Sequence, residues 1–473
     1  MPTQRLLTAL VPVALALSVS FPAHAGVSLI GIGQISGSDL SGLTNTLENG
    51  APANILGGLG SAIAWAGGDT FLLTPDRGPN ASAWNSAVDN TTSWIPRFQT
   101  MNLGLSTTTF SAGSLATLTP VLNATTLLSS STALNYGSAP VLTGSNGENY
   151  FTGRSDAFAT GTSTNPNNAR LDLEGIRVAA DGKSVYISDE YGPYIYRFDR
   201  ATGERTGVIT LPEKFAAPTP AATESAEIAA NTSGRVTNKG MEGLAITPDG
   251  KTLVGVMQSP LAQDGGTAAS TVRIVTIDLA TGKVTHEYAY ELDNIGTTAK
   301  PKYGTISEIV AINDHEFIID ERDGKGLGDD SKAVQKKLYT INLNGAQDVG
   351  TLTGAANLAG KAVSKTLFVD LVALLKANGY TDRTIPAKIE GLAFGPDVWV
   401  DGVLQHSLIV VNDNDFLDTV DVNGTPTANP NQFFVLGITG DVFADFQTQQ
   451  IPEPASLALA ALGLTGFMLR RRK

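Results

Sequence analysis

Short apolar runs alternate with Gly, Asp, Asn and Pro turns through most of the chain, between residues 26 and 450. Runs of this length, bounded by such turns, predict β-strands. A convincing 3.6-residue apolar spacing occurs over residues 363–378, which predicts one helix there. The pattern therefore indicates an all-β protein with long loops at residues 106–168 and 213–237 as insertions.

The strand pattern repeats. The stretch "LEGIRVAADGKSVYISDEYGPYIYRFD" (residues 173–199) has relatives that begin with "MEGLAITPDGK", "ISEIVAINDHEF", "IEGLAFGP" and "LGSAIAWAGGD". Each reads as strand, turn, polar-ended strand, strand, turn and strand, which is typical of a four-stranded antiparallel propeller blade. Five repeats are clear. We expect a six-bladed β-propeller, with the last blade degenerate or built from both termini, and "VSLIGIGQI" (residues 27–35) is the candidate N-terminal contribution.

Acidic residues recur at fixed places in these repeats. Glu174, Glu242, Glu308 and Glu390 precede the first strand core in four repeats, and Ser61 takes that place in the earliest one. A second polar cluster ends the next strand. Because that strand is antiparallel to the first, both groups are expected at one mouth of the central channel. The second group comprises Asp76, Asp189, Glu190, Glu321, Asp323 and Asp413.

A ring of like charges needs bound cations, interleaved Lys or Arg, or raised pKa values. Oxygen ligands without Cys or clustered His favour Ca²⁺, with Mg²⁺ as the alternative. We predict a cation held by members of this ring, an anion clamp, and a catalytic carboxylate that activates water or protonates the leaving group. The predicted metal ligands are Asp76, Asp189, Glu190, Glu242, Glu321, Asp323, Glu390 and Asp413; the clamp is Arg77, Arg322 and Lys388; the catalytic candidates are Glu174 and Glu308.

A purely structural interpretation stays open for each of these residues. A Glu at a strand start can cap loop amides, and Arg77 and Arg322 can simply pair with carboxylates of adjacent blades. Other chemistry has weaker support. The sequence contains no G-x-S-x-G elbow, no Walker loop and no Cys/His zinc spacing, and it has no cysteine.

Both ends of the chain carry export signals. Arg5, an apolar stretch and Ala23-His24-Ala25 predict a signal peptide over residues 1–25. At the other end, residues 451–473 combine Pro452-Glu453-Pro454, an apolar stretch expected to form a short helix, and a basic end that stays cytoplasmic. This tail resembles the PEP-CTERM sorting signal of Gram-negative bacteria. The resemblance implies transient anchoring in the inner membrane, processing by an exosortase, and a final place in the periplasm, at the cell surface or outside the cell.

The remaining body, residues 26–450, is strongly acidic. Without the two terminal segments, which hold five cations and one acid, the 32 Lys+Arg and 45 Asp+Glu of the chain fall to 27 and 44. The net charge is then −17, which opposes binding to nucleic acid.

The repeats resemble a known family, the "esterase-like activity of phytase" domain. The similarity rests on "LEGIRVAADGKSVYISDEYGP", "NKGMEGLAITPDGKTLVGVMQSPL", "ISEIVAINDHEFIIDERDG" and "IEGLAFGP", and on "TPDRG", in which Pro75 replaces the usual Ser of S-D-R-G. It runs from about residue 57 to residue 434. It implies a β-propeller with an esterase or phosphoesterase association and supplies no catalytic residues.

We therefore expect an exported hydrolase of a phosphate ester or related ester. Two alternatives remain. One is a non-catalytic propeller that binds a ligand or exopolysaccharide at the same mouth. The other is a Ca²⁺-dependent, lactonase-like hydrolase.

Overall fold

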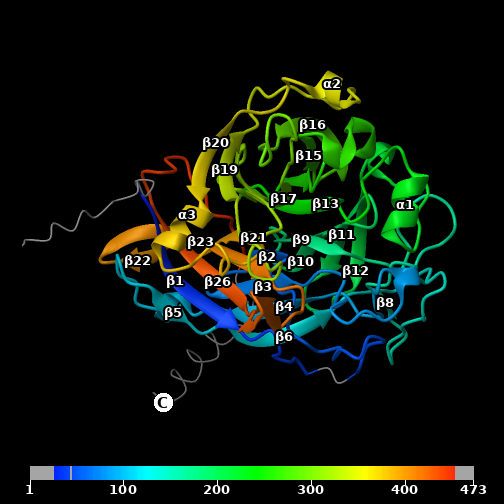
Figure 1. Cartoon of the computed structure of the whole chain (residues 1–473), viewed down its shortest axis with the longest axis horizontal. Coiled ribbons are helices and arrows are strands. Elements are labelled where there is room, and N and C mark those ends of the chain that lie inside the picture. Colours follow the sequence, from blue (N-terminus) through cyan, green and yellow to red (C-terminus); the bar gives the residue numbers. More distant parts are fainter. Residues whose placement is uncertain (1–25, 43–44, 453–473) are drawn as a thin grey trace, which may run out of the picture.

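Five sheets surround one axis in the part of the chain that the computed structural model describes, residues 26–42 and 45–452 (Figure 1). The first blade contains β2 (Ala62–Trp65), β3 (Thr70–Thr74), β4 (Arg97–Asn102) and β6 (Val121–Leu127). The second contains β9 (Leu173–Val178), β10 (Ser184–Asp189), β11 (Tyr194–Asp199) and β12 (Arg205–Thr210). The third contains β13 (Met241–Ile246), β14 (Thr252–Met257), β15 (Thr271–Asp278) and β16 (Lys283–Glu291).

The fourth blade contains β17 (Thr305–Ala311), β18 (Glu316–Arg322), β19 (Lys336–Asn342) and β20 (Lys365–Asp370). The fifth contains β21 (Lys388–Phe394), β22 (Val398–Val400), β23 (Val403–Asp413), β26 (Asn431–Thr439), β1 (Val27–Ile35) and β5 (Ala116–Leu118). Outside the blades lie the helices α1 (Glu224–Ala230), α2 (Ala355–Leu358) and α3 (Leu371–Ala377). Two small sheets also lie there, β7 (Ser129–Ser130) with β8 (Asn149–Tyr150) and β24 (Thr419–Val422) with β25 (Thr425–Ala428).

The propeller of antiparallel blades is confirmed, but the expected sixth blade is wrong. The strand β1 does come from the N-terminus as expected. It pairs with β26 inside the fifth blade and is followed there by β5, so the two ends of the domain close one existing blade. Five hydrophobic clusters then complete the circle, one between each pair of neighbouring blades. The ring closes with five blades because each blade already packs against a neighbouring blade on both sides.

Two other expectations need correction. The apolar segment 363–378 was expected to be one helix, but its first half is β20, whose residues pair with β19, and only Leu371–Ala377 is helical. The supposed insertion at residues 106–168 contains β5 and β6, which belong to the fifth and first blades. Pairing with neighbouring strands outweighs local helical spacing in the first case.

The terminal segments predicted from sequence, the signal peptide and the C-terminal hydrophobic helix, lie outside the described residues. Within the described ranges, none of the helices has the length and apolar character needed to cross a bilayer.

The central channel is plugged by one ion pair. Arg177 on β9 donates to the carbonyls of Ile63 at 2.8 Å and Ile309 at 2.8 Å, which lie on the first and fourth blades. Its guanidinium also lies 3.1 Å from Oε1 of Glu308, a fully buried carboxylate on β17. That same oxygen accepts from the backbone N–H of Leu244 at 3.0 Å. Arg177 thus ties several blades together across the axis.

The far end of the channel is covered by the last described residues. The backbone N–H of Gln447 donates to the carbonyl of Ile312 at 2.9 Å, and Gln449 Nε2 donates to that of Val178 at 2.7 Å. These residues, with Phe446, line a cavity of about 40 Å³ beneath Arg177. Within the described residues, this segment covers the channel below the plug, and the predicted acidic groups belong to the opposite mouth.

Removing the plug is expected to destabilise the whole propeller. Arg177→Met leaves Glu308 buried without its cation, so we expect a loss of about 3–5 kcal/mol in the free energy of unfolding, measured by urea denaturation. Arg177→Met with Glu308→Gln is expected to lose less than the sum of the two single variants. Strictly additive losses would contradict the coupling.

Candidate functional site

The inner strands bring carboxylates to the open mouth by means of β-bulges. On β9, Leu173 pairs with Asp189 and Gly175 with Ser188, so Glu174 is the extra residue. The same shift occurs on β13 around Glu242 and on β21 around Glu390. A bulge re-aims the side chain of its extra residue, which here takes Glu out of the regular in-and-out alternation.

The glycine that follows each bulged Glu is required by close packing of the inner strands. A Cβ on Gly175 would lie 2.8 Å from Leu244 Cβ, and one on Gly243 would lie 2.8 Å from the backbone N of Ile309. Real Cβ atoms do not approach this closely, so the E-G pair in the sequence couples an axial carboxylate to tight contact between blades.

The fourth blade departs from this pattern. On β17, Ile306 pairs with Glu321 and Glu308 with Asp320, so the extra residue is Ser307 rather than Glu308. Glu308 occupies the place of the glycine and belongs to the plug. At the mouth the fourth blade instead supplies Ser307 and Arg322, whose Nε donates to Ser307 Oγ at 2.7 Å.

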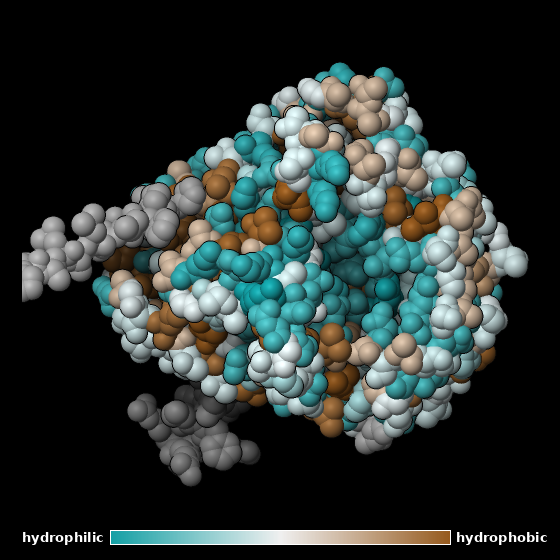
Figure 2. All heavy atoms as spheres, viewed as in Figure 1, coloured by the Kyte–Doolittle hydropathy of each residue, from teal (hydrophilic) through white to brown (hydrophobic). Residues whose placement is uncertain are grey.

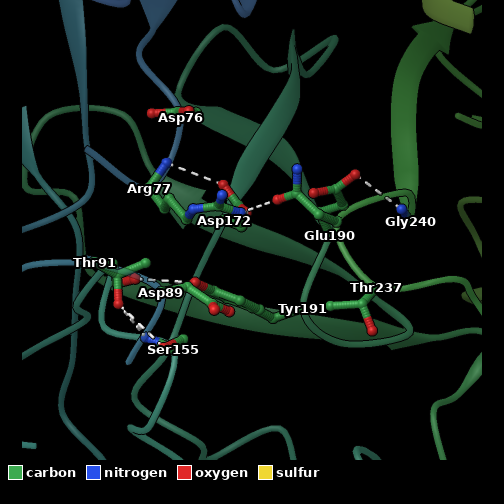
Figure 3. Close-up of polar contacts among 12 residues, drawn as sticks. Asp76, Arg77, Asp89, Thr91, Ser155, Asp172, Glu190, Tyr191, Thr237 and Gly240 are labelled. Carbon is green, nitrogen blue, oxygen red and sulfur yellow. Dashed lines mark hydrogen bonds and ion pairs between the residues drawn. The ribbon is translucent and has the colours of Figure 1, made fainter. Parts of the chain in front are cut away.

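Three carboxylates of the second blade meet at this mouth. Oxygens of Asp172, Glu174 and Glu190 lie within 4.8 Å of one another, and the three residues are 1%, 9% and 2% exposed. We call these three residues the acidic triad. Figure 3 shows Asp172 between Arg77 and Glu190. The group can supply several hard oxygen ligands to one divalent cation.

Two carboxylates of the triad accept hydrogen bonds from other residues, and for the third none is recorded in the described chain. Asp172 accepts from the backbone N–H of Arg77 at 3.0 Å and from its Nη1 at 2.8 Å. Glu190 accepts from the backbone N–H of Gly240 at 2.9 Å. For the Glu174 carboxylate, no hydrogen bond is recorded with the described residues, and Glu242 Oε2 nearby is buried without a partner there. A bound cation or shared protons would satisfy these oxygens.

Burial and mutual repulsion raise the pKa values at the mouth. Burial, then the charges of Glu242 and Asp172, raises the pKa of Glu174 well above its usual range. Burial, then the charge of Glu190, does the same to the pKa of Glu242. Burial also raises the pKa of Glu190 and that of Asp413 to about 7. Without a bound cation, these carboxyl groups therefore keep their protons to a higher pH than ordinary carboxyl groups do.

The three predicted anion-clamp residues all lie at this mouth, and each is paired with acid. Arg77 holds Asp172, and Arg322 forms an ion pair with Glu390. Lys388 lies 3.3 Å from Asp413 and also contacts Asp415. The Arg322–Glu390 pair joins the fourth and fifth blades and the Arg77–Asp172 pair joins the first and second, whereas Lys388 pairs within the fifth blade.

The structure therefore brings most of the predicted site residues together. Those gathered at the mouth are Asp76, Arg77, Glu174, Glu190, Glu242, Arg322, Lys388, Glu390 and Asp413, which the hydrogen bonds and mutual charge effects connect. Figure 2 shows a hollow lined by hydrophilic residues near the centre of the ring of blades.

Four predicted site residues lie outside this group because local contacts take up their side chains. Asp189 caps its own turn by accepting from the N–H groups of Tyr191 and Gly192 at 3.0 and 3.1 Å. Glu321 accepts from Tyr290 Oη at 2.9 Å. Asp323 pairs with Lys336, and Glu308 pairs with Arg177.

Sequence reasoning missed Asp172. It precedes Glu174 by two residues in "LDLEG", outside the repeated E-G signature, because it belongs to the segment that leads into β9. The signal that was available is the pair of acids flanking Leu173 at one strand start. At the corresponding place the other repeats have Leu59, Gly240, Thr305 and Lys388, so the repeat pattern itself did not point to it.

A protein-family model matches this chain. Residues 54–416 match the family described as esterase-like activity of phytase, more than half of the chain. The chain belongs to this family. Residues 450–473 match the PEP-CTERM protein-sorting motif, so the chain also carries this sorting signal.

A curated relative and several solved structures were also found. A protein of Arthroderma benhamiae, described as an uncharacterized secreted protein, is 33% identical over 203 residues, which span 38% of this chain and 38% of that protein.

The solved structures include a putative 6-phosphogluconolactonase from Bacteroides uniformis (12% identity, 79% of this chain and 88% of that chain, TM-score 0.28). They also include an aldose sugar dehydrogenase from Streptomyces coelicolor (12% identity, 87% and 94%, TM-score 0.29). At TM-scores this low, neither comparison bears on function.

The raised pKa values predict an unusual pH dependence of stability. Glu190 has a pKa of about 7 when folded, against about 4.3 for an unperturbed Glu. Between these values the folded protein binds more protons than the unfolded chain, so the free energy of unfolding falls as pH rises.

We therefore expect chelator-treated protein to be less stable at pH 8 than at pH 5, by on the order of 1–3 kcal/mol, measured by urea denaturation. Ca²⁺ is expected to restore the loss at pH 8 and to have less effect at pH 5, where protons compete. A stability that rises from pH 5 to pH 8 in the chelated protein would contradict this assignment.

Proposed function

We propose that this protein is an exported, divalent-cation-dependent hydrolase of phosphate esters, and that the reaction takes place at the acidic mouth of the propeller. The observation that carries the proposal is the acidic triad, in which the buried Glu174 carboxylate has no recorded partner among the described residues and lies beside the Arg77–Asp172 pair. An acidic site and an arginine side by side suit a cation and the anion that it binds.

The donor set fits a hard cation. Asp172, Glu174 and Glu190 would hold Ca²⁺ or Mg²⁺, and both ions take oxygen ligands. When bound, the cation would neutralise the crowded carboxylates and stabilise charge on phosphate oxygens. Arg77 would attract and orient the phosphate, since its guanidinium is held in place by Asp172 at 2.8 Å.

Glu242 is our candidate for proton transfer. Its Oε2 is buried and unpartnered among the described residues, and burial raises the pKa of Glu242 well above the usual range, which favours the protonated form that a general acid needs. In the proposed reaction water attacks phosphorus, the ester P–O bond breaks, and Glu242 protonates the departing oxygen. The proton lost by the attacking water restores Glu242, so the atoms balance. Glu308 is no longer a catalytic candidate, because it lies in the plug.

A competing function is cation-mediated binding without turnover, for example of an exopolysaccharide. It is favoured by the pairing of Arg77, Arg322 and Lys388 with carboxylates, which leaves these cations partly neutralised. A Ca²⁺-dependent lactonase-like activity would use the same triad. The candidate functions differ in their substrate: the first hydrolyses a phosphate ester, the second hydrolyses nothing, and the third hydrolyses a lactone.

The sorting motif adds a proposal about location. We propose that residues 1–25 are removed on export, and that the tail anchors the protein in the inner membrane until an exosortase-type enzyme processes it. The described chain ends at Pro452, which lies near Gly182 in the β9–β10 turn, at the opposite end of β9 from Glu174. The anchored propeller would therefore hold its acidic mouth away from the membrane.

Turnover by the purified protein tests the proposed function. We expect phosphate monoesters to be hydrolysed with Ca²⁺ or Mg²⁺ but not with chelator, and we expect aryl acetate and lactones to be poor substrates. Glu242→Gln should lower kcat at least 100-fold, because general acid catalysis contributes about 10²–10⁴. Glu204→Gln, a change at an exposed turn of the same chain, is the matched control. If the protein turns over none of these phosphate esters, or if Glu242→Gln is as active as the control, the proposal is wrong.

A further inference from the structure

A polar cavity of about 260 Å³ adjoins the acidic triad. Five separate segments form it: the loop after β3, the residues around Ser155, the residues around Arg170, the turn that carries Tyr191, and the loop that carries α1. Figure 3 shows Arg77 and Asp172 between Asp76 on one side and Asp89, Thr91 and Tyr191 on the other. Arg77 lines the cavity and also holds the triad, so the two sites share this residue.

A second, deeply buried guanidinium lines the same cavity. Arg170 is 3% exposed, and its Nη1 donates to the carbonyl of Ser155 at 3.1 Å. Its Nη2 has no hydrogen-bond partner among the described residues, since Glu227 lies 3.7 Å away and forms a closer pair with Arg235 at 2.8 Å. Arg77 Nε is likewise buried without a partner there. Both nitrogens are also closed off from solvent, so the two guanidiniums act on the cavity as buried positive charges.

The other residues that line the cavity restrict the charge and the size of the ligand that it can bind. The two guanidiniums are outnumbered by three carboxylates, those of Asp89, Glu224 and Glu227, so the cavity accommodates one anionic group and repels several. The polar lining side chains include Asn80 and Thr223, for which no side-chain hydrogen bond is recorded in the described chain, whereas the hydroxyls of Thr91, Tyr191 and Thr237 already donate to protein oxygens. The volume of about 260 Å³ lies just below the range for ligand pockets, about 300–1,000 Å³, which suits a small ligand.

We propose that this cavity is the specificity pocket of the enzyme, and that it takes the hydroxyl-rich carbon skeleton of a small phosphate monoester, such as a sugar or polyol monophosphate. The single phosphate lies at Arg77, next to the acidic triad, and the hydroxyl groups meet the amides and hydroxyls of the lining. This inference rests on the proposed hydrolase function and specifies its substrate class. A densely phosphorylated polyol is a poor substrate, because its further phosphates meet Asp89, Glu224 and Glu227.

The test compares three substrates on the purified full-length protein with Ca²⁺ or Mg²⁺: a hexose monophosphate, an aryl phosphate and inositol hexakisphosphate. We expect kcat/KM for the hexose monophosphate to exceed each of the others at least tenfold. Asn80→Ala and Thr223→Val remove lining groups for which no side-chain hydrogen bond is recorded in the described chain, so these variants keep the fold.

Each of these variants should raise KM for the hexose monophosphate about threefold to tenfold, the effect of losing a hydrogen bond, and leave kinetics on the aryl phosphate unchanged. Asn344→Ala, at an exposed turn after β19, is the matched control and changes neither.

The outcomes separate the two proposals. If the aryl phosphate or the hexakisphosphate is turned over as well as the hexose monophosphate, the specificity pocket is wrong and the hydrolase proposal stands. Equal effects of Asn80→Ala on the aryl and hexose substrates also overturn the pocket. If no phosphate ester is hydrolysed with either cation, the proposed function and the pocket assignment fail together.

Discussion

Repulsion between carboxylates at the open mouth is the constraint on which the site depends. The bulged inner strands deliver Glu174, Glu242 and Glu390 to one end of the channel, and the second strands add Asp413 and Glu190 beside them. Three cations, Arg77, Arg322 and Lys388, neutralise part of this charge. The surplus is concentrated in the second blade, where burial removes the screening that water would supply. Protons relieve the repulsion at low pH, and a divalent cation relieves it at neutral pH.

The crowded carboxylates at the mouth are separated from a second part of the channel, in which Arg177 and Glu308 stabilise the fold. Arg177 satisfies backbone carbonyls from neighbouring blades and neutralises Glu308, so a buried charge pair replaces what would otherwise be an open axial hole. Below it, the segment that leads to the sorting tail covers the far opening. In the described part of the chain, the plug and the covered far end leave the acidic mouth as the side from which a ligand enters the channel.

Much of this arrangement could be predicted from the repeated E-G and D-E signatures, because strand geometry alone places both at one end of each blade. The prediction failed in the fourth blade because its Glu stands one place later than in the E-G repeats. In "ISEIV" the bulge therefore falls on Ser307, and Glu308 takes the place of the glycine and turns into the channel. The blade number failed for another reason, since nothing local in "VSLIGIGQI" tells whether it completes a new blade or joins an existing one. Asp172 was missed because it lies outside the repeat.

A crystal structure of the protein grown with Ca²⁺ tests the central claim most directly. The account predicts an ion coordinated by oxygens of Asp172, Glu174 and Glu190 at the distances usual for Ca²⁺, about 2.3–2.6 Å. At millimolar Ca²⁺ and neutral pH, a mouth without an ion, in which Glu174 instead shares a proton with a neighbouring carboxylate, would contradict it.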